Sequence, residues 1–123
     1  IEKGGNYGWR RFEGTTVYSR WTKIPKGTAK EPIFTYGREK GVSITGGYTY
    51  RGSIKAMQGA YICADYATGR TFLLRVNQKG QLIKSRDLGA YPYNVASFAE
   101  DEKGELYLCS FARGQIFKLV GVE

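Results

Sequence analysis

At 123 residues the chain has the length of one domain, and such a domain buries roughly two-thirds of its unfolded surface. Its 17 Gly, 10 Tyr and 6 Phe residues favour an all-β fold of short strands and tight turns. Lys and Arg outnumber Asp and Glu by 19 to 11, but no compact basic run or nucleic-acid module occurs, and no apolar run is long enough to span a membrane. We therefore expect a solvated basic surface, no nucleic-acid partner and no membrane span.

The first 30 residues are a Gly- and aromatic-rich lead. The run Gly4-Gly5-Asn6-Tyr7-Gly8-Trp9 predicts a tight loop in which glycines adopt positive φ. Tyr7 and Trp9 have two possible roles, a structural plug, which we favour, and a platform that stacks on a sugar. Oxygen atoms of such a loop can bind calcium, but no dense set of carboxylates accompanies it, so no metal ligand is assigned.

Two stretches of the chain, 59–74 and 104–119, repeat each other. The matched pairs include Gly59 with Gly104, Gly69 with Gly114, Phe72 with Phe117 and Leu74 with Leu119. These pairs are 45 residues apart, a period typical of propeller blades. Cys63 and Cys109 are 46 residues apart, so pairing them requires a one-residue insertion in one copy.

Apolar residues alternate within each copy and flank an Ala-x-Gly turn, so each copy predicts a β-hairpin. Two further strands are expected before each hairpin. They are 31–36 and 43–51 before the first, and 82–88 and 93–100 before the second. The sequence thus predicts two four-stranded antiparallel blades, 31–76 and 82–123, of a β-propeller.

Because an antiparallel meander alternates direction, the predicted loops fall at two ends of the blades. One end should carry 37–42, 66–69, 89–92 and 112–114, and the other 52–59, 77–81 and 101–104. Packed sheets lie about 10 Å apart, so Cys63 and Cys109 should be too distant for a disulfide. We interpret both as small buried apolar residues.

Two blades leave two broad sheet faces unpacked, and repeat folds usually need three or more units. The chain begins at Ile1 and not at Met. We therefore expect the remaining blades as partners, located upstream in the same polypeptide or on another chain.

Several motifs occur in an order that resembles the glucose/sorbosone dehydrogenase family, closest to its hedgehog-interacting-protein-like branch. They are Gly4–Trp9 with Phe12-Glu13-Gly14, Thr45–Gly52, Gly59-Ala60-Tyr61, Asp65-Tyr66 with Gly69-Arg70, and Ser97–Asp101 with Gly104–Tyr107. The resemblance spans nearly the whole chain. It implies the C-terminal part of a six-bladed propeller in a secreted or periplasmic protein.

The resemblance also implies an activity, the oxidation of a sugar hydroxyl by hydride transfer to pyrroloquinoline quinone (PQQ), with calcium nearby and a His as general base. This chain contains no His, so we assign it no catalytic residue and expect the base in an upstream blade. The chain would supply scaffold and one wall of the active-site mouth, and its basic surface would suit an anionic redox partner. The alternative is a non-catalytic propeller that binds a protein or polysaccharide.

Family members that hold PQQ place a Lys in the loop equivalent to 66–69 and two Arg before the last inner strand. Here Ala67 or Thr68 occupies the first position, and the second falls among Pro92, Tyr93 and Asn94. The cationic clamp for the quinone carboxylates is therefore missing.

A rearranged anion site would use Lys40, Arg70, Tyr93 and Asn94. With Arg38 and Ala67 these residues form the set that we expect at the mouth. The ordinary interpretation of Arg70 and Arg113 is that they cover aromatic surface or pair with an acid such as Asp65.

Overall fold

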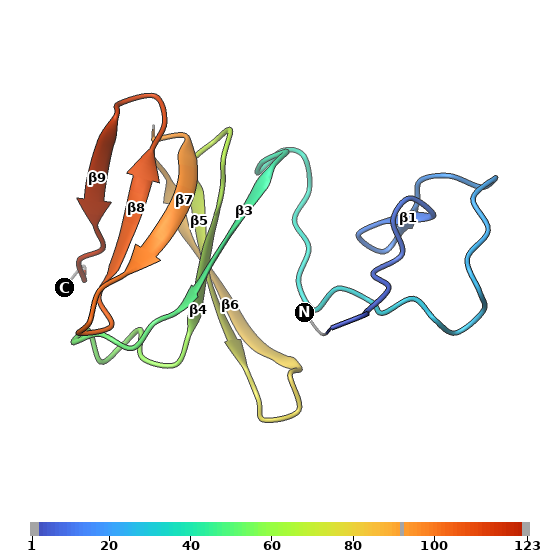
Figure 1. Cartoon of the computed structure of the whole chain (residues 1–123), viewed down its shortest axis with the longest axis horizontal. Coiled ribbons are helices and arrows are strands. Elements are labelled where there is room, and N and C mark those ends of the chain that lie inside the picture. The colour runs from blue at the N-terminus through green and yellow to red at the C-terminus, as the bar shows by residue number, and fades with distance from the viewer. Residues whose placement is uncertain (1–2, 92, 122–123) are drawn as a thin grey trace. The chain divides into compact units, whose positions relative to one another are not determined.

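The computed structural model describes residues 3–91 and 93–121, and within them the chain is all-β, with antiparallel sheets and no helix (Figure 1). The all-β prediction is confirmed. The described residues accordingly include no helix with the length and apolar character needed to cross a bilayer. The chain divides after Thr35 into two compact units.

The first unit contains one small hairpin and otherwise irregular backbone. Strand β1 (Phe12–Glu13) pairs with β2 (Thr16–Val17) across a turn in which Gly14 has φ 58°. The guanidinium of Arg11 donates hydrogen bonds to the carbonyls of Ser19 and Arg20, at 3.0 and 2.7 Å. These bonds hold the segments that enter and leave the hairpin beside each other.

The tight loop predicted at 4–9 is present. Gly4 and Gly8 have φ 73° and 84°, and the Asn6 side chain accepts a hydrogen bond from the Gly8 N–H at 2.9 Å. Asn6 also forms an isolated bridge to Ala29, which ties this loop to the end of the unit. Trp9 is 68% exposed, so it is not a buried plug within this unit.

Seven strands in two sheets form the second unit (Figure 1). The first sheet has the order β3 (Ile44–Thr49), β4 (Tyr61–Asp65), β5 (Arg70–Val76) and β6 (Leu82–Ala90). The second has the order β7 (Val95–Glu100), β8 (Leu106–Ser110) and β9 (Gln115–Lys118). Each strand thus pairs with its neighbour in sequence, as a meander does.

Two strand assignments from the sequence are wrong. Residues 31–36 form no strand, because Pro32 lacks a backbone donor and Tyr36 instead stacks on Phe72 at 4.8 Å. The strand expected to open the second sheet, 82–88, belongs to the first sheet as β6. The cause is a tight hairpin turn, in which the Asn77 side chain accepts hydrogen bonds from the N–H groups of Lys79 and Gln81.

The 45-residue repeat holds through both hairpins without an insertion. Gly69 and Gly114 both have positive φ, 65° and 60°, as do Gly59 and Gly104. Cys63 pairs with Phe72 across β4 and β5, and Leu108 pairs with Phe117 across β8 and β9. The counterpart of Cys63 is therefore Leu108, and matching Cys63 with Cys109 was wrong. Both cysteines are free thiols, Cys63 buried and Cys109 partly buried.

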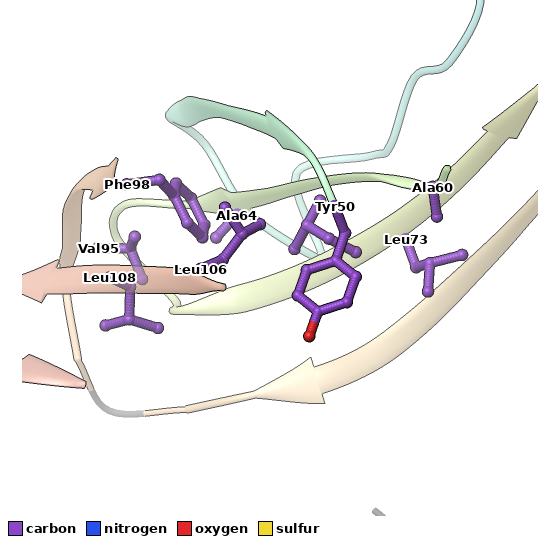
Figure 2. Close-up of a cluster of buried hydrophobic side chains, with 9 residues drawn as sticks. Tyr50, Ala60, Ala64, Leu73, Val95, Phe98, Leu106 and Leu108 are labelled. Atoms are coloured by element: carbon purple, nitrogen blue, oxygen red, sulfur yellow. The ribbon is translucent and has the colours of Figure 1, made fainter. Parts of the chain in front are cut away.

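The main hydrophobic core lies between the two sheets, and Figure 2 shows its side chains directed into one layer. The core residues are Tyr50, Ala60, Ile62, Ala64, Leu73, Val95, Phe98, Leu106 and Leu108. Strand β3, the first of its sheet, also contacts β7, the first of the other. The two sheets therefore approach each other most closely at their first strands.

Unlike faces of the two sheets meet in this core. The first sheet contributes Ile62 and Ala64, while Cys63 points to the opposite face because side chains alternate along a strand. The second sheet contributes Leu108, which is the counterpart of Cys63. The front of one sheet thus packs against the back of the next.

A buried carboxylate also joins the sheets at the end of β3. Glu105, 6% exposed, accepts hydrogen bonds from the Tyr50 hydroxyl at 2.6 Å and from the Ser53 hydroxyl and N–H at 2.5 and 2.9 Å. These three bonds lower the pKa of Glu105 from 4.5 to about 2. Because the loop after β3 donates and the residue before β8 accepts, the bonds connect the first sheet to the second.

Removing core volume between the sheets should destabilise the chain strongly. We expect Leu106→Ala to lower the free energy of unfolding by about 2 to 5 kcal/mol, because Leu106 is fully buried and leaves a cavity. The control Ile116→Ala, at a position that is 71% exposed, should change it by less than about 0.5 kcal/mol. Urea denaturation followed by circular dichroism measures both, and equal effects would show that the sheets do not pack as described.

Acid should weaken the connection at Glu105. Its folded-state pKa is depressed, so its stabilisation is fully present above about pH 4.5, the unfolded value, and is lost as the pH falls toward about 2. Glu105→Gln should flatten the dependence of the unfolding free energy on pH between these limits. The exposed turn residue Glu102, changed to Gln, should leave that dependence as it is in the wild type. A wild-type slope in Glu105→Gln would contradict the assignment.

Candidate functional site

Four loops gather at one end of the second unit, as the strand directions predicted. Thr68 donates to the carbonyl of Lys40 at 2.9 Å, and the Asn94 amide donates to the carbonyl of Tyr66 at 3.2 Å. The N–H of Phe111 in turn donates to the Asn94 carbonyl at 3.0 Å. These bonds, with that from the Tyr91 N–H to the Gly69 carbonyl, link the segments 37–43, 66–69, 88–91 with 93–94, and 111–114, which we call the Asp65 loop end.

Asp65 organises this end. Its side chain is fully buried and accepts hydrogen bonds from five backbone or hydroxyl donors. They are the N–H groups of Ser43 at 2.6 Å and of Ala67 and Thr68 at 2.9 Å, and the hydroxyls of Tyr36 at 3.0 Å and Thr68 at 3.2 Å. Any side chain at Gly41 would collide with this carboxylate. The loop before β3 and the turn after β4 are thus built around one buried charge.

The Asp65 carboxylate stays ionised although it is buried. Burial alone would raise its pKa, but the hydrogen bonds from Thr68, Ser43 and Tyr36 outweigh that effect and lower it. The same contact acts in the opposite direction on Tyr36, whose pKa is raised by burial and by its bond to Asp65. Tyr36 therefore serves as a neutral hydrogen-bond donor at neutral pH.

Lys40 and Arg70 lie together, as expected for the mouth, and they share one acid. Arg70 pairs with Asp87 at 2.8 Å, and the Lys40 ammonium lies 3.8 Å from the same oxygen. Burial would raise the pKa of Asp87, but the Gly89 N–H and these two cations lower it. The acid that pairs with Arg70 is thus Asp87 and not Asp65.

Tyr93 and Asn94 have roles within the fold. The Tyr93 ring stacks on Phe117 at 4.4 Å and on Tyr91 at 5.9 Å, and the Arg113 guanidinium lies 5.3 Å from its centre. Arg113 therefore covers aromatic surface, one of the two ordinary roles expected for it. Asn94 adopts φ 45°, a conformation that Asn tolerates, and its side chain bonds to the neighbouring loop.

The remaining residues of the predicted mouth differ in what the structure places around them. Arg38 and Ala67 are both exposed, and Ala67 belongs to the turn held by Asp65. Pro92 lies outside the described residues. The sequence therefore brings Lys40, Ala67, Arg70, Tyr93 and Asn94 to one loop end, but most of their polar groups already have partners.

These residues do not fit a tricarboxylate quinone. PQQ needs uncompensated cations, yet Lys40 and Arg70 are paired with Asp87, and Arg113 is engaged with Tyr93. Within residues 3–91 and 93–121, moreover, no three acidic or cysteine side chains lie close enough to hold a metal ion. No step of a reaction is therefore assigned to this loop end.

Sequence reasoning missed the two acids that shape the site. Asp65 stands directly before the Tyr-Ala-Thr-Gly turn, a position from which Asp commonly caps turn N–H groups. Asp87 precedes Leu-Gly on a strand that was placed in the wrong sheet. The first acid was recognisable from local turn chemistry, whereas the second required knowing that β5 and β6 pair.

No family model matches the chain. Among curated proteins, it is 35% identical over 83 residues to the HIPL1 protein of Arabidopsis thaliana, and 35% identical over 77 residues to the HIPL2 protein of the same plant. These matches cover 56% and 53% of this chain but only 12% and 11% of the relatives. The likeness agrees with the resemblance to hedgehog-interacting-protein-like propellers.

Neutralising Asp65 should loosen the loop end. Asp65→Asn replaces one acceptor oxygen with an NH2 group that faces donors, so we expect a loss of about 1 to 3 kcal/mol in unfolding free energy. Hydrogen exchange at the Ser43, Ala67 and Thr68 amides should accelerate. Asp101→Asn, a change of the same kind in a turn at the other end of the strands, should leave those three amides unchanged. Unaltered exchange in Asp65→Asn would contradict the assigned role.

Proposed function

We propose that this chain forms two consecutive blades of a β-propeller in a longer polypeptide. The observation that carries the proposal is the packing of unlike sheet faces, with the first strands β3 and β7 adjacent. Such packing repeats with the same relation from one sheet to the next, so successive sheets continue around an axis. The 45-residue period and the likeness to much longer relatives support the same arrangement.

In that propeller the chain serves as scaffold and as one wall of a mouth at the Asp65 loop end. Its loops there are connected by hydrogen bonds from the Thr68 hydroxyl, the Asn94 side-chain amide and the Phe111 N–H, so they present a fixed surface and not a mobile one. Binding of a protein or polysaccharide requires only such a surface. The proposed role is therefore non-catalytic for this part of the molecule.

The order of the motifs favours a second candidate for the whole polypeptide, a PQQ-dependent sugar dehydrogenase of a secreted or periplasmic kind. It would oxidise a sugar hydroxyl with a base and quinone-binding cations supplied entirely by other blades. This chain contains no His, and its loop-end cations are already paired. Its contribution would again be the wall of the mouth.

The blade proposal predicts a change in cysteine reactivity. In the 123-residue chain, partly buried Cys109 should react with iodoacetamide faster than Cys63, which is buried and whose pKa is raised to about 11 by burial. In the longer polypeptide the next blade should cover the face that carries Cys109, and its rate should fall at least about tenfold. Mass spectrometry of alkylated peptides measures both rates, with urea-unfolded protein as the control. Equal Cys109 rates in the two proteins would refute the proposal.

Quinone binding tests whether this chain itself contributes to a PQQ site. We expect no saturable binding of PQQ to the 123-residue chain in calcium-containing buffer, because Asp87 already compensates Lys40 and Arg70. Equilibrium dialysis with absorbance detection provides the measurement. Asp87→Asn frees Lys40 and Arg70 from their ion pairs without removing either cation. It therefore shows whether that pairing prevents PQQ from binding. Saturable binding by the wild type that Arg70→Gln weakens would overturn the non-catalytic assignment.

A further inference from the structure

An aromatic and basic surface covers the small hairpin of the first unit. Trp9 is 68% exposed, Tyr18 58% and Trp21 94%, and the Trp9 and Tyr18 rings lie 5.1 Å apart. The hydrogen bonds from Arg11 to the carbonyls of Ser19 and Arg20 bring the two segments that carry these rings together. Exposing several large aromatic rings to water is energetically unfavourable. A cluster of exposed rings therefore indicates a binding surface.

Basic side chains alternate with these rings in the sequence. Residues 3–35 carry seven Lys or Arg and two acids. The bases are Lys3, Arg10, Arg11, Arg20, Lys23, Lys26 and Lys30, and the acids are Glu13 and Glu31. Arg10 follows Trp9 directly and Arg20 precedes Trp21, so positive charge borders the exposed rings. The surface is therefore complementary to an anion with flat apolar faces.

A pocket of about 350 Å³ opens in the same unit and is large enough for one sugar ring. Its lining residues include Tyr7 and Phe12, two prolines, Lys26, Lys30 and Glu31. An acid in the wall repels any anionic group, but it accepts hydrogen bonds from the hydroxyl groups that each uronic acid ring carries and that the DNA backbone lacks. This favours a carboxylated sugar over a nucleic acid as the occupant.

We propose that the first unit binds an anionic polysaccharide whose units are uronic acids. Exposed Trp9, Tyr18 and Trp21 stack on the apolar faces of sugar rings, as aromatic rings do on flat apolar partners. The bases pair with the carboxylates, and the pocket holds one ring with Lys26 near its carboxylate and Glu31 near its hydroxyls. The proposal does not depend on the propeller, because all of its residues lie in the first unit.

Tryptophan fluorescence of the 123-residue chain tests the proposal directly, because both of its Trp residues, Trp9 and Trp21, lie on this surface. Titration with polygalacturonate should shift the emission to the blue and saturate. The affinity should fall as NaCl rises from about 0.05 to about 0.5 M, because salt screens exposed charges. Neutral dextran and oligothymidylate should bind at least about tenfold more weakly.

Variants separate recognition from folding. Trp21→Ala should weaken polygalacturonate binding at least about fivefold, and it cannot disturb the core because its ring is 94% exposed. Lys26→Gln should weaken binding and reduce its salt dependence. The matched controls Phe111→Ala and Lys84→Gln, an exposed ring and an exposed base of the second unit, should bind like the wild type. Isothermal titration calorimetry measures the affinity of variants that lack a Trp.

Three results would overturn the proposal. Equal affinity for oligothymidylate would identify a general polyanion surface, and equal affinity for dextran would show that the bases are not used. Wild-type affinity in Trp21→Ala and in Lys26→Gln would place any binding elsewhere on the chain. Failure of the propeller proposal would leave all these outcomes unchanged, so the two proposals fail separately.

Discussion

The hydrophobic contact between the two sheets of the second unit is the interaction on which that unit depends. Ala64 of the first sheet meets Leu106 and Leu108 of the second in one buried layer (Figure 2), to which Ile62 of the first sheet also belongs. A single three-stranded or four-stranded sheet leaves its apolar face in water, so each sheet needs the other to exclude water from its inner face. The polar connections at the two ends of the strands are built onto this layer.

Each end of the layer uses a buried acid as an organising centre. Glu105 collects hydrogen bonds from Tyr50 and Ser53, and Asp65 collects them from backbone N–H groups of two loops. A buried carboxylate is stable only when donors replace its hydration, so each acid fixes the position of the donors around it. The conformation of the loops at both ends is therefore set by two buried carboxylates.

The sequence predicted the class of fold and the repeat because both are local properties. Gly59, Gly69, Gly104 and Gly114 mark turns wherever the strands pair, and alternating apolar residues mark the hairpins. The sheet to which the segment 82–90 belongs could not be predicted from the segment itself. Assigning it to the first sheet required recognising the turn at Asn77 as a β-hairpin turn. The site was predicted only in part. The alternating direction of the strands places Lys40 and Arg70 at the same end of the sheet. Their ion pairs with Asp87 could not be predicted, because they depend on the pairing of β5 with β6.

The central claim is that the sheets stack with unlike faces together, and methyl NOE spectroscopy of the 123-residue chain tests it most directly. The account predicts cross-peaks from the Leu106 and Leu108 methyl groups to at least one of Ile62, Ala64 and Leu73. It predicts none from those two residues to Leu74, which lies on the opposite face of the first sheet. Cross-peaks from Leu106 or Leu108 to Leu74, with none to Ile62, Ala64 or Leu73, would contradict it.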